Sequence, residues 1–216
     1  MYQLYYFPGN ANLAPHMLLE EIGVPYQLIA VDRANNAQKS TEYLKLNPTG
    51  RIPVLVDGEL TLFETAAICL HLADRHPEAG LAPTVGSPER AEFYKWLVYL
   101  TNTLQAELIT YFYPRRLTDD DATAEQVKRH AEARVSGEGA MLDILDAQLA
   151  RSGGPWLLGA KYSAADPYLM MLARWTRGMA HPANRRRHLK PFLDAMAVRP
   201  AVQRAFEQEG LKPPLY

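Results

Sequence analysis

The chain has 216 residues, of which 48% are hydrophobic and 22% are charged, and its formal net charge is −1 at pH 7. This composition is ordinary for a globular protein, and the length allows one large domain or two modest ones with a sizeable core. The balanced charge gives no reason to expect nucleic acid or a membrane as a partner, and the sequence predicts neither a membrane span nor a signal peptide.

Cys69 is the only cysteine, which excludes an internal disulfide and a multi-cysteine metal site. It lies in TAAICLHLAD with apolar neighbours on every side, so we expect a buried core thiol rather than a reactive nucleophile. A reducing, cytoplasmic location is the simplest interpretation, and we expect no metal.

The first 76 residues alternate between strand and helix patterns. QLYYF predicts a strand, LAPHMLLEEIG a helix, YQLIAVD a second strand and STEYLKLNP a short helix. Because a helix connects the first two strands, we expect them to be parallel.

A hairpin is predicted in IPVLVDGELTLFE, where Asp57-Gly58 separates two extended apolar segments. Counting outward from that turn pairs Leu55 with Leu60 and Pro53 with Leu62. TAAICLHLADRH then returns to a helical pattern, so the expected order in this half is β-α-β-α-β-β-α.

The composition changes in HPEAGLAPTVGSP, which has three prolines and two glycines. We therefore predict a linker over 77–88, between an α/β domain at 1–76 and an all-α domain at 89–216. No strand pattern follows the linker. The sequence predicts one long helix over 88–113, a second over 123–154, a third over 163–178, and two shorter helices near the end.

The loop PGNAN, residues 8–12, leads from the first strand into the first helix. The N–H groups and the dipole at a helix N-terminus favour negative charge. The loop contains no Ser, Cys or His that could act as a nucleophile, so we expect it to hold an anion that belongs to a ligand.

This order of elements, with the motifs NPTGRIPVLVDG, LFETAAI and YSAADPYLMML, resembles the cytosolic glutathione transferases over essentially the whole chain. The pattern around the opening loop is nearest to the bacterial beta class but lacks its catalytic cysteine, because Ala11 stands there. The resemblance implies a thioredoxin-like N-terminal domain followed by an all-helical domain. It also implies a homodimer, with residues 60–75 of one subunit facing the long helices of the other.

The resemblance also implies a binding site for glutathione. In such folds Pro53 follows a cis peptide bond, and the backbone of Ile52 pairs with the cysteinyl part of glutathione. Glu64 would bind the ammonium group of the γ-glutamyl end, and Thr65 with nearby helix N–H groups its carboxylate. An ordinary tight turn and a simple helix start remain the alternatives for these two motifs. Lys39 and Arg51 complete the implied glutathione site.

The loop's anion is then the thiolate of glutathione. A thiol with a pKa near ~8.5 is only a few per cent ionised at pH 7, and a helix N-terminus with one good donor lowers that pKa by about one to two units. We rank Asn10 first as this donor, Tyr6 second and Asn12 third. Tyr6 as a packing aromatic remains open, and we interpret His16 as a structural histidine.

The electrophile is expected beside the end of the first long helix. The candidates are Tyr111 and Tyr113 for stacking, Arg115 for a carboxylate or nitro group, and Trp175 on the third long helix. Interdomain packing with solvated arginines is the alternative, and we interpret residues 184–188, NRRRH, as a solvated connection.

The predicted function is therefore a glutathione transferase that conjugates the thiolate to small apolar electrophiles, with glutathione as co-substrate. A glutathione-dependent disulfide reductase would use the same thiolate site. A non-catalytic protein that binds glutathione or apolar ligands is the third possibility.

Overall fold

The computed structural model describes residues 1–216, which form two compact units. The first unit comprises Met1–Ala82 and Ala197–Leu215, and the second comprises Pro83–Met196 with Tyr216. The segment from Ala197 onward therefore belongs with the N-terminal unit, whereas the sequence pattern grouped it with the helices of 89–216.

A sheet with the strand order β2-β1-β3-β4 forms the centre of the first unit. The strands are β1 (Tyr2–Tyr6), β2 (Tyr26–Ala30), β3 (Val54–Asp57) and β4 (Leu60–Phe63). β1 and β2 are parallel, and the β1–β3 and β3–β4 pairs are antiparallel. This confirms the predicted parallel pair and the predicted hairpin.

The register of the hairpin differs from the predicted one. Leu55 pairs with Leu62 and Asp57 pairs with Leu60, so the turn consists of Gly58-Glu59 rather than Asp57-Gly58. Gly58 has φ +60°, and glycine is the residue that adopts a positive φ at the first central position of a two-residue turn without steric cost. Asp57 therefore stays in the strand.

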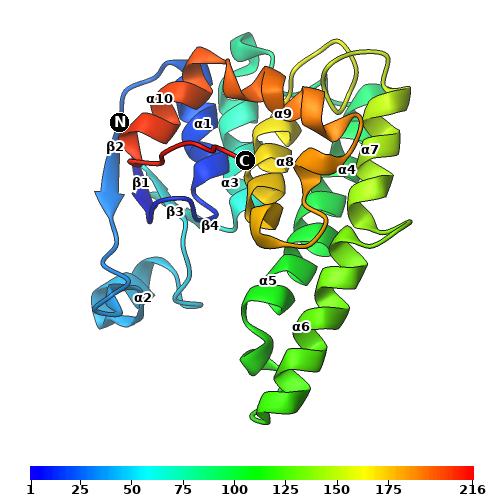
Figure 1. The fold of residues 1–216 in the computed structure, drawn as a ribbon. Helices are drawn as coiled ribbons and strands as arrows, with labels where there is room; N and C mark the ends of the chain where they lie inside the picture. Colours follow the sequence, from blue (N-terminus) through cyan, green and yellow to red (C-terminus); the bar gives the residue numbers. More distant parts are fainter. The chain divides into compact units, whose positions relative to one another are not determined.

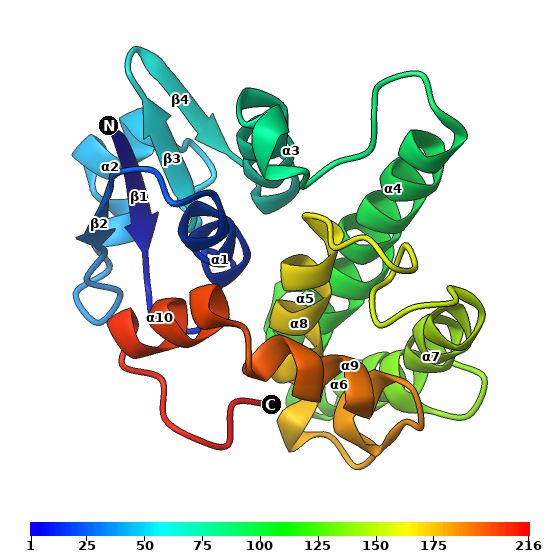
Figure 2. The ribbon, with the colours of Figure 1, turned by 90° about the horizontal axis from the view of Figure 1, so that it is seen from above.

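Helices cover both faces of this sheet (Figure 2). On one face α1 (Leu13–Ile22) lies beside α3 (Thr65–Arg75), and α10 (Pro200–Gln208) packs against α1. On the other face α2 (Thr41–Leu46) contributes Tyr43 to a cluster with Val31, Ile52 and Val54. The thioredoxin-like character expected for this domain is confirmed.

The second unit is entirely helical. Its helices are α4 (Pro88–Val98), α5 (Ala106–Phe112), α6 (Asp121–Ser136), α7 (Met141–Arg151), α8 (Ala165–Trp175) and α9 (Leu189–Ala197). π-helical turns at Tyr99–Gln105 join α4 to α5, so the long helix predicted over 88–113 is continuous as far as Phe112. α5 and α6 run side by side (Figure 1).

The prediction of a single helix over 123–154 is wrong, because this segment forms two helices separated by residues 137–140. Gly139 has φ +67°, and a Cβ on Gly137 would lie 2.5 Å from the carbonyl oxygen of Ala133. Both glycines are therefore required where the chain turns out of α6.

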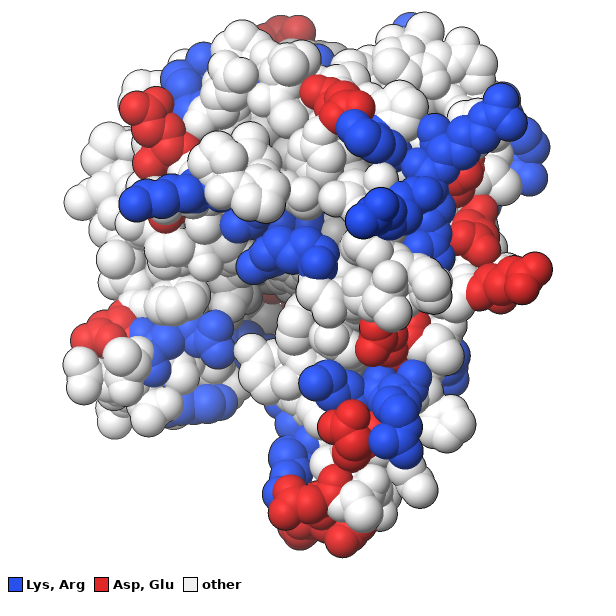
Figure 3. Space-filling view, in the orientation of Figure 1, with Lys and Arg blue, Asp and Glu red and all other residues white.

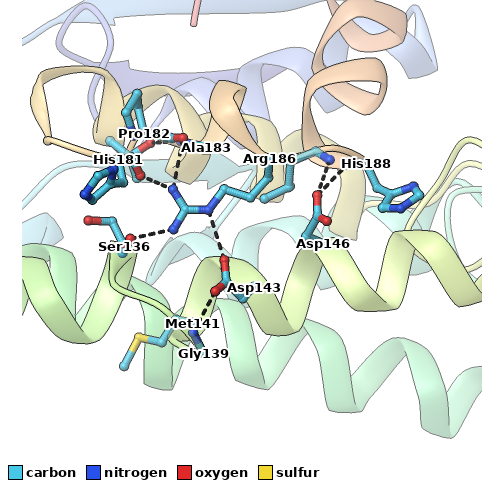
Figure 4. A network of polar contacts seen from close by, with 12 residues as sticks. Ser136, Gly139, Met141, Asp143, Asp146, His181, Pro182, Ala183, Arg186 and His188 are labelled. Atoms are coloured by element: carbon cyan, nitrogen blue, oxygen red, sulfur yellow. Dashed lines mark hydrogen bonds and ion pairs between the residues drawn. The ribbon is translucent and has the colours of Figure 1, made fainter.

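Arg186 fixes this turn and is not a solvated residue (Figure 4). Its Nε lies 3.1 Å from Asp143 Oδ1, and its Nη2 donates to the carbonyl oxygen of Ser136 at 2.5 Å. Its Nη1 donates to the carbonyl oxygens of His181 and Pro182. The rest of the 184–188 segment includes the exposed Arg185 and Arg187.

Cys69 is fully buried in α3, and burial raises the pKa of its thiol. A neutral, inaccessible thiol is not a nucleophile, which confirms the interpretation as a core residue. None of the helices combines the length and apolar character that a membrane span needs. His, Cys, Asp and Glu side chains nowhere gather in a group that could hold a metal ion.

Candidate functional site

The loop between β1 and α1 satisfies most of its own backbone donors. The N–H of Asn10 donates to the carbonyl oxygen of Phe7 at 3.1 Å, and the N–H of Ala11 donates to Asn10 Oδ1 at 2.7 Å. Because Oδ1 faces an N–H group, the side-chain Nδ2 of Asn10 points elsewhere and has no partner. The Tyr6 hydroxyl likewise makes no hydrogen bond, so the loop offers two side-chain donors.

Asn12 lies elsewhere than expected. Its side chain is fully buried, where Oδ1 accepts from the N–H of Phe7 at 3.1 Å and Nδ2 donates to Glu209 Oε1 at 2.8 Å. An amide committed at both ends supports the loop from inside and is a poor candidate for a ligand donor. The structure therefore separates Asn12 from Asn10 and Tyr6.

His16 is buried in α1 and bonded at both ring nitrogens. Nδ1 lies 2.8 Å from Glu209 Oε1, and Nε2 lies 3.0 Å from both the Tyr26 hydroxyl and Gln208 Oε1. This confirms the interpretation of His16 as a structural histidine.

Ile52 precedes Pro53 across a cis peptide bond, as the resemblance implies. Neither its N–H nor its C=O forms a hydrogen bond with another described residue, although Ile52 as a whole residue is only 9% exposed. The adjacent carbonyl of Arg51 is held by the Tyr43 hydroxyl at 2.8 Å and by Asn47 Nδ2 at 2.7 Å. The chain is therefore anchored at the Arg51 carbonyl, whereas the N–H and C=O of Ile52 remain unpaired. Unpaired backbone groups of this kind are what a strand edge needs to pair with an extended peptide.

Glu64 and Thr65 occupy the N-terminus of α3. Glu64 has φ +75° and ψ 113°, a conformation that costs of order 1–3 kcal/mol for a residue with a side chain. Its carboxylate is exposed and has no partner. Thr65 Oγ1 donates to the carbonyl oxygen of Ala11 at 3.2 Å, so the hydroxyl joins α3 to the opening loop. The first N–H groups of α3 remain as donors for an anion.

Lys39 and Arg51 belong to the segment that surrounds α2. Lys39 Nζ donates to the carbonyl oxygen of Thr49 at 3.2 Å, and the Arg51 side chain is exposed. Lysine and arginine side chains outnumber acidic ones over this segment (Figure 3). A Cβ on Gly50 would lie 2.6 Å from Lys39 Nζ and 2.9 Å from the carbonyl oxygen of Gln38, so the turn before Arg51 requires glycine. The segment suits an anionic group.

The candidate electrophile residues of the second unit have two different environments. Tyr111 and Arg115 line an open groove of about 480 Å³ with Phe112, Pro114, Asp121, Ala124, Glu125 and Lys128. Arg115 is ion-paired with Asp121 and donates to the Asp119 carbonyl, so its charge is already compensated.

Tyr113 and Trp175 are not part of that groove. The Arg116 guanidinium lies 4.2 Å above the Tyr113 ring, and Trp175 meets Phe112 edge-on with ring centroids 6.2 Å apart. The structure therefore brings Tyr111 and Arg115 together and places Tyr113 and Trp175 in separate aromatic contacts.

The contacts of Glu209, Tyr43 and Asn47 with the candidate site are not indicated by any sequence pattern. Glu209 follows α10 in a charged stretch, QEG, that is typical of a solvated helix end, and nothing local relates it to a loop 200 residues earlier. Asn47 stands before Pro48, a pattern that indicates only the end of a helix.

Comparison with known proteins places these features in a family. The model of the glutathione S-transferase N-terminal domain matches residues 1–74, and that of the C-terminal domain matches residues 104–209. The glutathione S-transferase GST-4.5 of Xanthomonas campestris is 32% identical, over 97% of this chain and 99% of its own length. The disulfide-bond oxidoreductase YfcG of Escherichia coli is 33% identical, over 77% of this chain and 76% of its own.

A solved structure is similar over the full length. The structure of a glutathione transferase homologue from Sulfitobacter, with bound glutathione, has a TM-score of 0.88 and 29% identity, and the match covers 98% of this chain and 99% of that one. Both domain models and near-complete coverage of transferase relatives lead to one conclusion. The chain belongs to the glutathione S-transferase family.

Proposed function

We propose that this chain conjugates glutathione to small apolar electrophiles. The glutathione thiolate attacks an electrophilic carbon, a carbon–sulfur bond forms, and a leaving group departs or a proton is added. The observation that carries the proposal is the set of unpaired groups in the first unit: the backbone of Ile52, the strained Glu64 and the amide of Asn10. Each matches one part of a γ-glutamyl tripeptide: Ile52 its extended backbone, Glu64 its ammonium group and Asn10 its thiolate.

The tripeptide would be held along the first unit. Ile52 pairs with the cysteinyl backbone through its unused N–H and C=O. The Glu64 carboxylate binds the γ-glutamyl ammonium, and the first N–H groups of α3 bind the neighbouring carboxylate. Lys39 and Arg51 supply positive charge for the carboxylate at the other end, consistent with the basic surface around α2 (Figure 3).

The thiolate would accept hydrogen bonds from the opening loop. Asn10 is the first candidate because its Nδ2 is unpaired while its Oδ1 is fixed by the N–H of Ala11. Tyr6 is the second candidate, since its hydroxyl also lacks a partner. An amide donor stabilises the anion but cannot take up its proton, so the thiol proton must leave to water or buffer.

The electrophile would stack on aromatic side chains of the second unit. Tyr111, at the groove beside α5 and α6, is the first candidate, and Tyr113 and Trp175 are further ones. Arg115 is a weaker candidate because Asp121 already neutralises it.

Reduction of glutathione mixed disulfides is the second candidate function. One relative is named a disulfide-bond oxidoreductase, and the same thiolate site would serve this reaction. Ala11 stands where beta-class transferases have a cysteine, so the attacking sulfur would be that of glutathione itself.

We also propose a cytoplasmic homodimer. Light scattering that gave a stable ~24 kDa species at micromolar concentration would contradict the dimer.

Calorimetry with glutathione tests the proposal. Glu64→Ala should weaken binding about tenfold to a hundredfold, because one charge-assisted contact is lost. The exposed Glu59, in the hairpin turn, provides the matched control, and Glu59→Ala should leave binding unchanged. Thr65→Ala added to Glu64→Ala should weaken binding further, since it also cuts the link to Ala11. Unchanged affinity in Glu64→Ala would contradict the assignment.

Turnover then separates the candidate reactions. Conjugation predicts steady-state consumption of a generic aryl halide, and disulfide reduction predicts turnover of a glutathione mixed disulfide. A protein that binds glutathione but turns over neither substrate would be a binding module.

A further inference from the structure

Arg33 lies beside the opening loop, although it belongs to the segment that follows β2. Its guanidinium carbon is 5.0 Å from the centre of the Phe7 ring, a distance typical of a cation–π contact. Both asparagines of the loop are bonded to Phe7, whose C=O accepts from the N–H of Asn10 and whose N–H donates to Asn12 Oδ1. A positive charge therefore lies next to the loop that is proposed to hold the thiolate.

The sheet brings these segments together at one edge. β1 and β2 are parallel and end at the same edge (Figure 2), and the N–H of Val31 still donates to the carbonyl oxygen of Tyr6 at 2.9 Å. β3 is antiparallel to β1, and β4 is antiparallel to β3, so β3 begins and β4 ends at that edge. The opening loop therefore shares this edge with Arg33, Ile52 and Glu64.

The strand order decides on which side of the opening loop each of these residues lies. Because the order is β2-β1-β3-β4, Ile52 and Glu64 lie on one side of the loop that follows β1, and Arg33 lies on the other. Ile52 and Glu64 are the proposed contacts of the cysteinyl backbone and the γ-glutamyl end of glutathione. Arg33 therefore flanks the thiolate position on the side that these parts of glutathione leave for a second substrate.

The guanidinium of Arg33 is suited to an anionic group. A guanidinium that stacks on an aromatic ring uses its face for that contact and presents its N–H donors in its plane, where they match the two oxygens of a carboxylate. The adjacent Asp32 carboxylate accepts from the N–H and Nδ2 of Asn35, at 3.2 and 2.6 Å, and forms no ion pair. The carbonyl oxygen of Arg33 accepts from the N–H of Asn36 at 3.2 Å, so the turn that carries this side chain is fixed.

We infer that Arg33 determines specificity by binding a carboxylate on the electrophile, which is otherwise apolar. The inference rests on the proposed function, in which the glutathione thiolate attacks that electrophile. Both carboxylates of glutathione already have proposed partners, one at the first N–H groups of α3 and the other at Lys39 and Arg51. The charge of Arg33 therefore narrows the substrate class to electrophiles that carry an acidic group.

The test compares two aryl halides with the same ring, a chloronitrobenzoate and the amide of the same acid. Each kcat/KM is divided by the rate constant of the uncatalysed reaction with glutathione, which removes the difference in intrinsic reactivity. The wild type should prefer the benzoate about tenfold to a hundredfold, because only the benzoate forms the charge-assisted hydrogen bonds. Arg33→Gln should abolish this preference by slowing the benzoate alone, and Arg33→Lys should keep part of it. Arg187→Gln, at an exposed position of the second unit, is the matched control and should behave as wild type.

Two further measurements separate binding of the electrophile from effects on glutathione. In Arg33→Gln, calorimetry should give the wild-type affinity for glutathione, and the ultraviolet titration of the bound thiol should not move. An equal loss with both aryl halides would overturn the inference, because Arg33 would then act on the thiolate or on the fold. Phe7→Leu keeps an apolar side chain against the cluster of Val31 and Ile52 but removes the ring, so the preference should fall severalfold. This variant decides if Arg33→Gln does not fold.

The outcomes distinguish this inference from the proposed function. A wild type that conjugates both aryl halides with equal normalised kcat/KM overturns the inference and leaves the proposed function intact. If the wild type binds glutathione but conjugates neither, the proposed conjugation fails, and calorimetry with the two S-aryl glutathione conjugates decides the inference. The wild type should then bind the acidic conjugate more tightly than the amide, and equal affinities would overturn the role of Arg33. A wild type that binds no glutathione overturns both.

Discussion

Asn47 makes three side-chain hydrogen bonds in the turn that presents Ile52, so Asn47→Ala should disturb both stability and binding. Nδ2 donates to the Arg51 carbonyl at 2.7 Å, and Oδ1 accepts from the N–H and the hydroxyl of Thr49 at 3.0 and 2.7 Å. Each such bond contributes about 0.5–1.5 kcal/mol net. Thr49 is exposed and rehydrates in the variant, so we expect a loss of about 1.5–3 kcal/mol.

Tyr43→Phe is the matched change on the same carbonyl. It removes one bond, from the Tyr43 hydroxyl to the Arg51 carbonyl, and keeps the ring that packs edge-on against Tyr5. Because Asn47 still satisfies that carbonyl, we expect a loss of only about 0.5–1.5 kcal/mol.

Urea unfolding gives the stability change, and calorimetry gives the affinity for glutathione. Asn47→Ala should lower the affinity severalfold, because the backbone of Ile52 is no longer held in its ligand-binding conformation, whereas Tyr43→Phe should lower it less. Full affinity in an Asn47→Ala protein that has lost the expected stability would refute the reasoning, since the turn would then be structural only.

Three further predictions follow from the first unit. Gly50→Ala should destabilise it by about 1 kcal/mol or more and weaken glutathione binding, because φ is +60° and the new methyl would meet the Gln38 carbonyl at 2.9 Å; urea unfolding and calorimetry test this. Glu64→Gly should raise stability by relieving the φ of +75° while weakening glutathione binding, so a change of both in the same direction would contradict the strain argument. Burial raises the pKa of Glu20, but hydrogen bonds from Tyr26, Arg204 and Gln208 outweigh it and hold that pKa below its ordinary value of 4.5. A carboxyl whose pKa is lower in the folded state stabilises that state at pH values above its unfolded pKa, and this contribution is lost as the pH falls through its folded pKa. Glu20→Gln should therefore flatten the fall in stability with decreasing pH below about pH 4.5.

Local features of the fold were predictable from sequence because local chemistry decides them. The alternation of strands and helices, the parallel pair and the hairpin all follow from short-range patterns. The predicted register of the hairpin is wrong, because the turn position depends on which residue adopts a positive φ. Gly58, and not Asp57, is the first central residue of the turn. The break between α6 and α7 was not predicted, because the helical pattern continues on both sides of the turn at Gly137 and Gly139.

The support of the candidate site was not predictable. Asn10 and Asn12 look alike in the sequence, and long-range contacts distinguish them, because Glu209 binds the amide of Asn12 and does not bind that of Asn10. A glutamate at a helix end is ordinarily solvated, so no pattern indicates that this one is buried against residues 200 positions away.

Thiolate stabilisation by Asn10 is tested by the ultraviolet titration of glutathione bound to the wild type, Asn10→Ala and Tyr6→Phe. For the wild type we expect a bound-thiol pKa about one to two units below the free value of ~8.5. Asn10→Ala should raise it by about one to two units, with turnover at pH 7 reduced roughly tenfold to a hundredfold, and Tyr6→Phe should leave it unmoved. A bound thiol that titrates like free glutathione would contradict thiolate stabilisation by the protein, and one that responds to Tyr6→Phe but not to Asn10→Ala would contradict the role of Asn10.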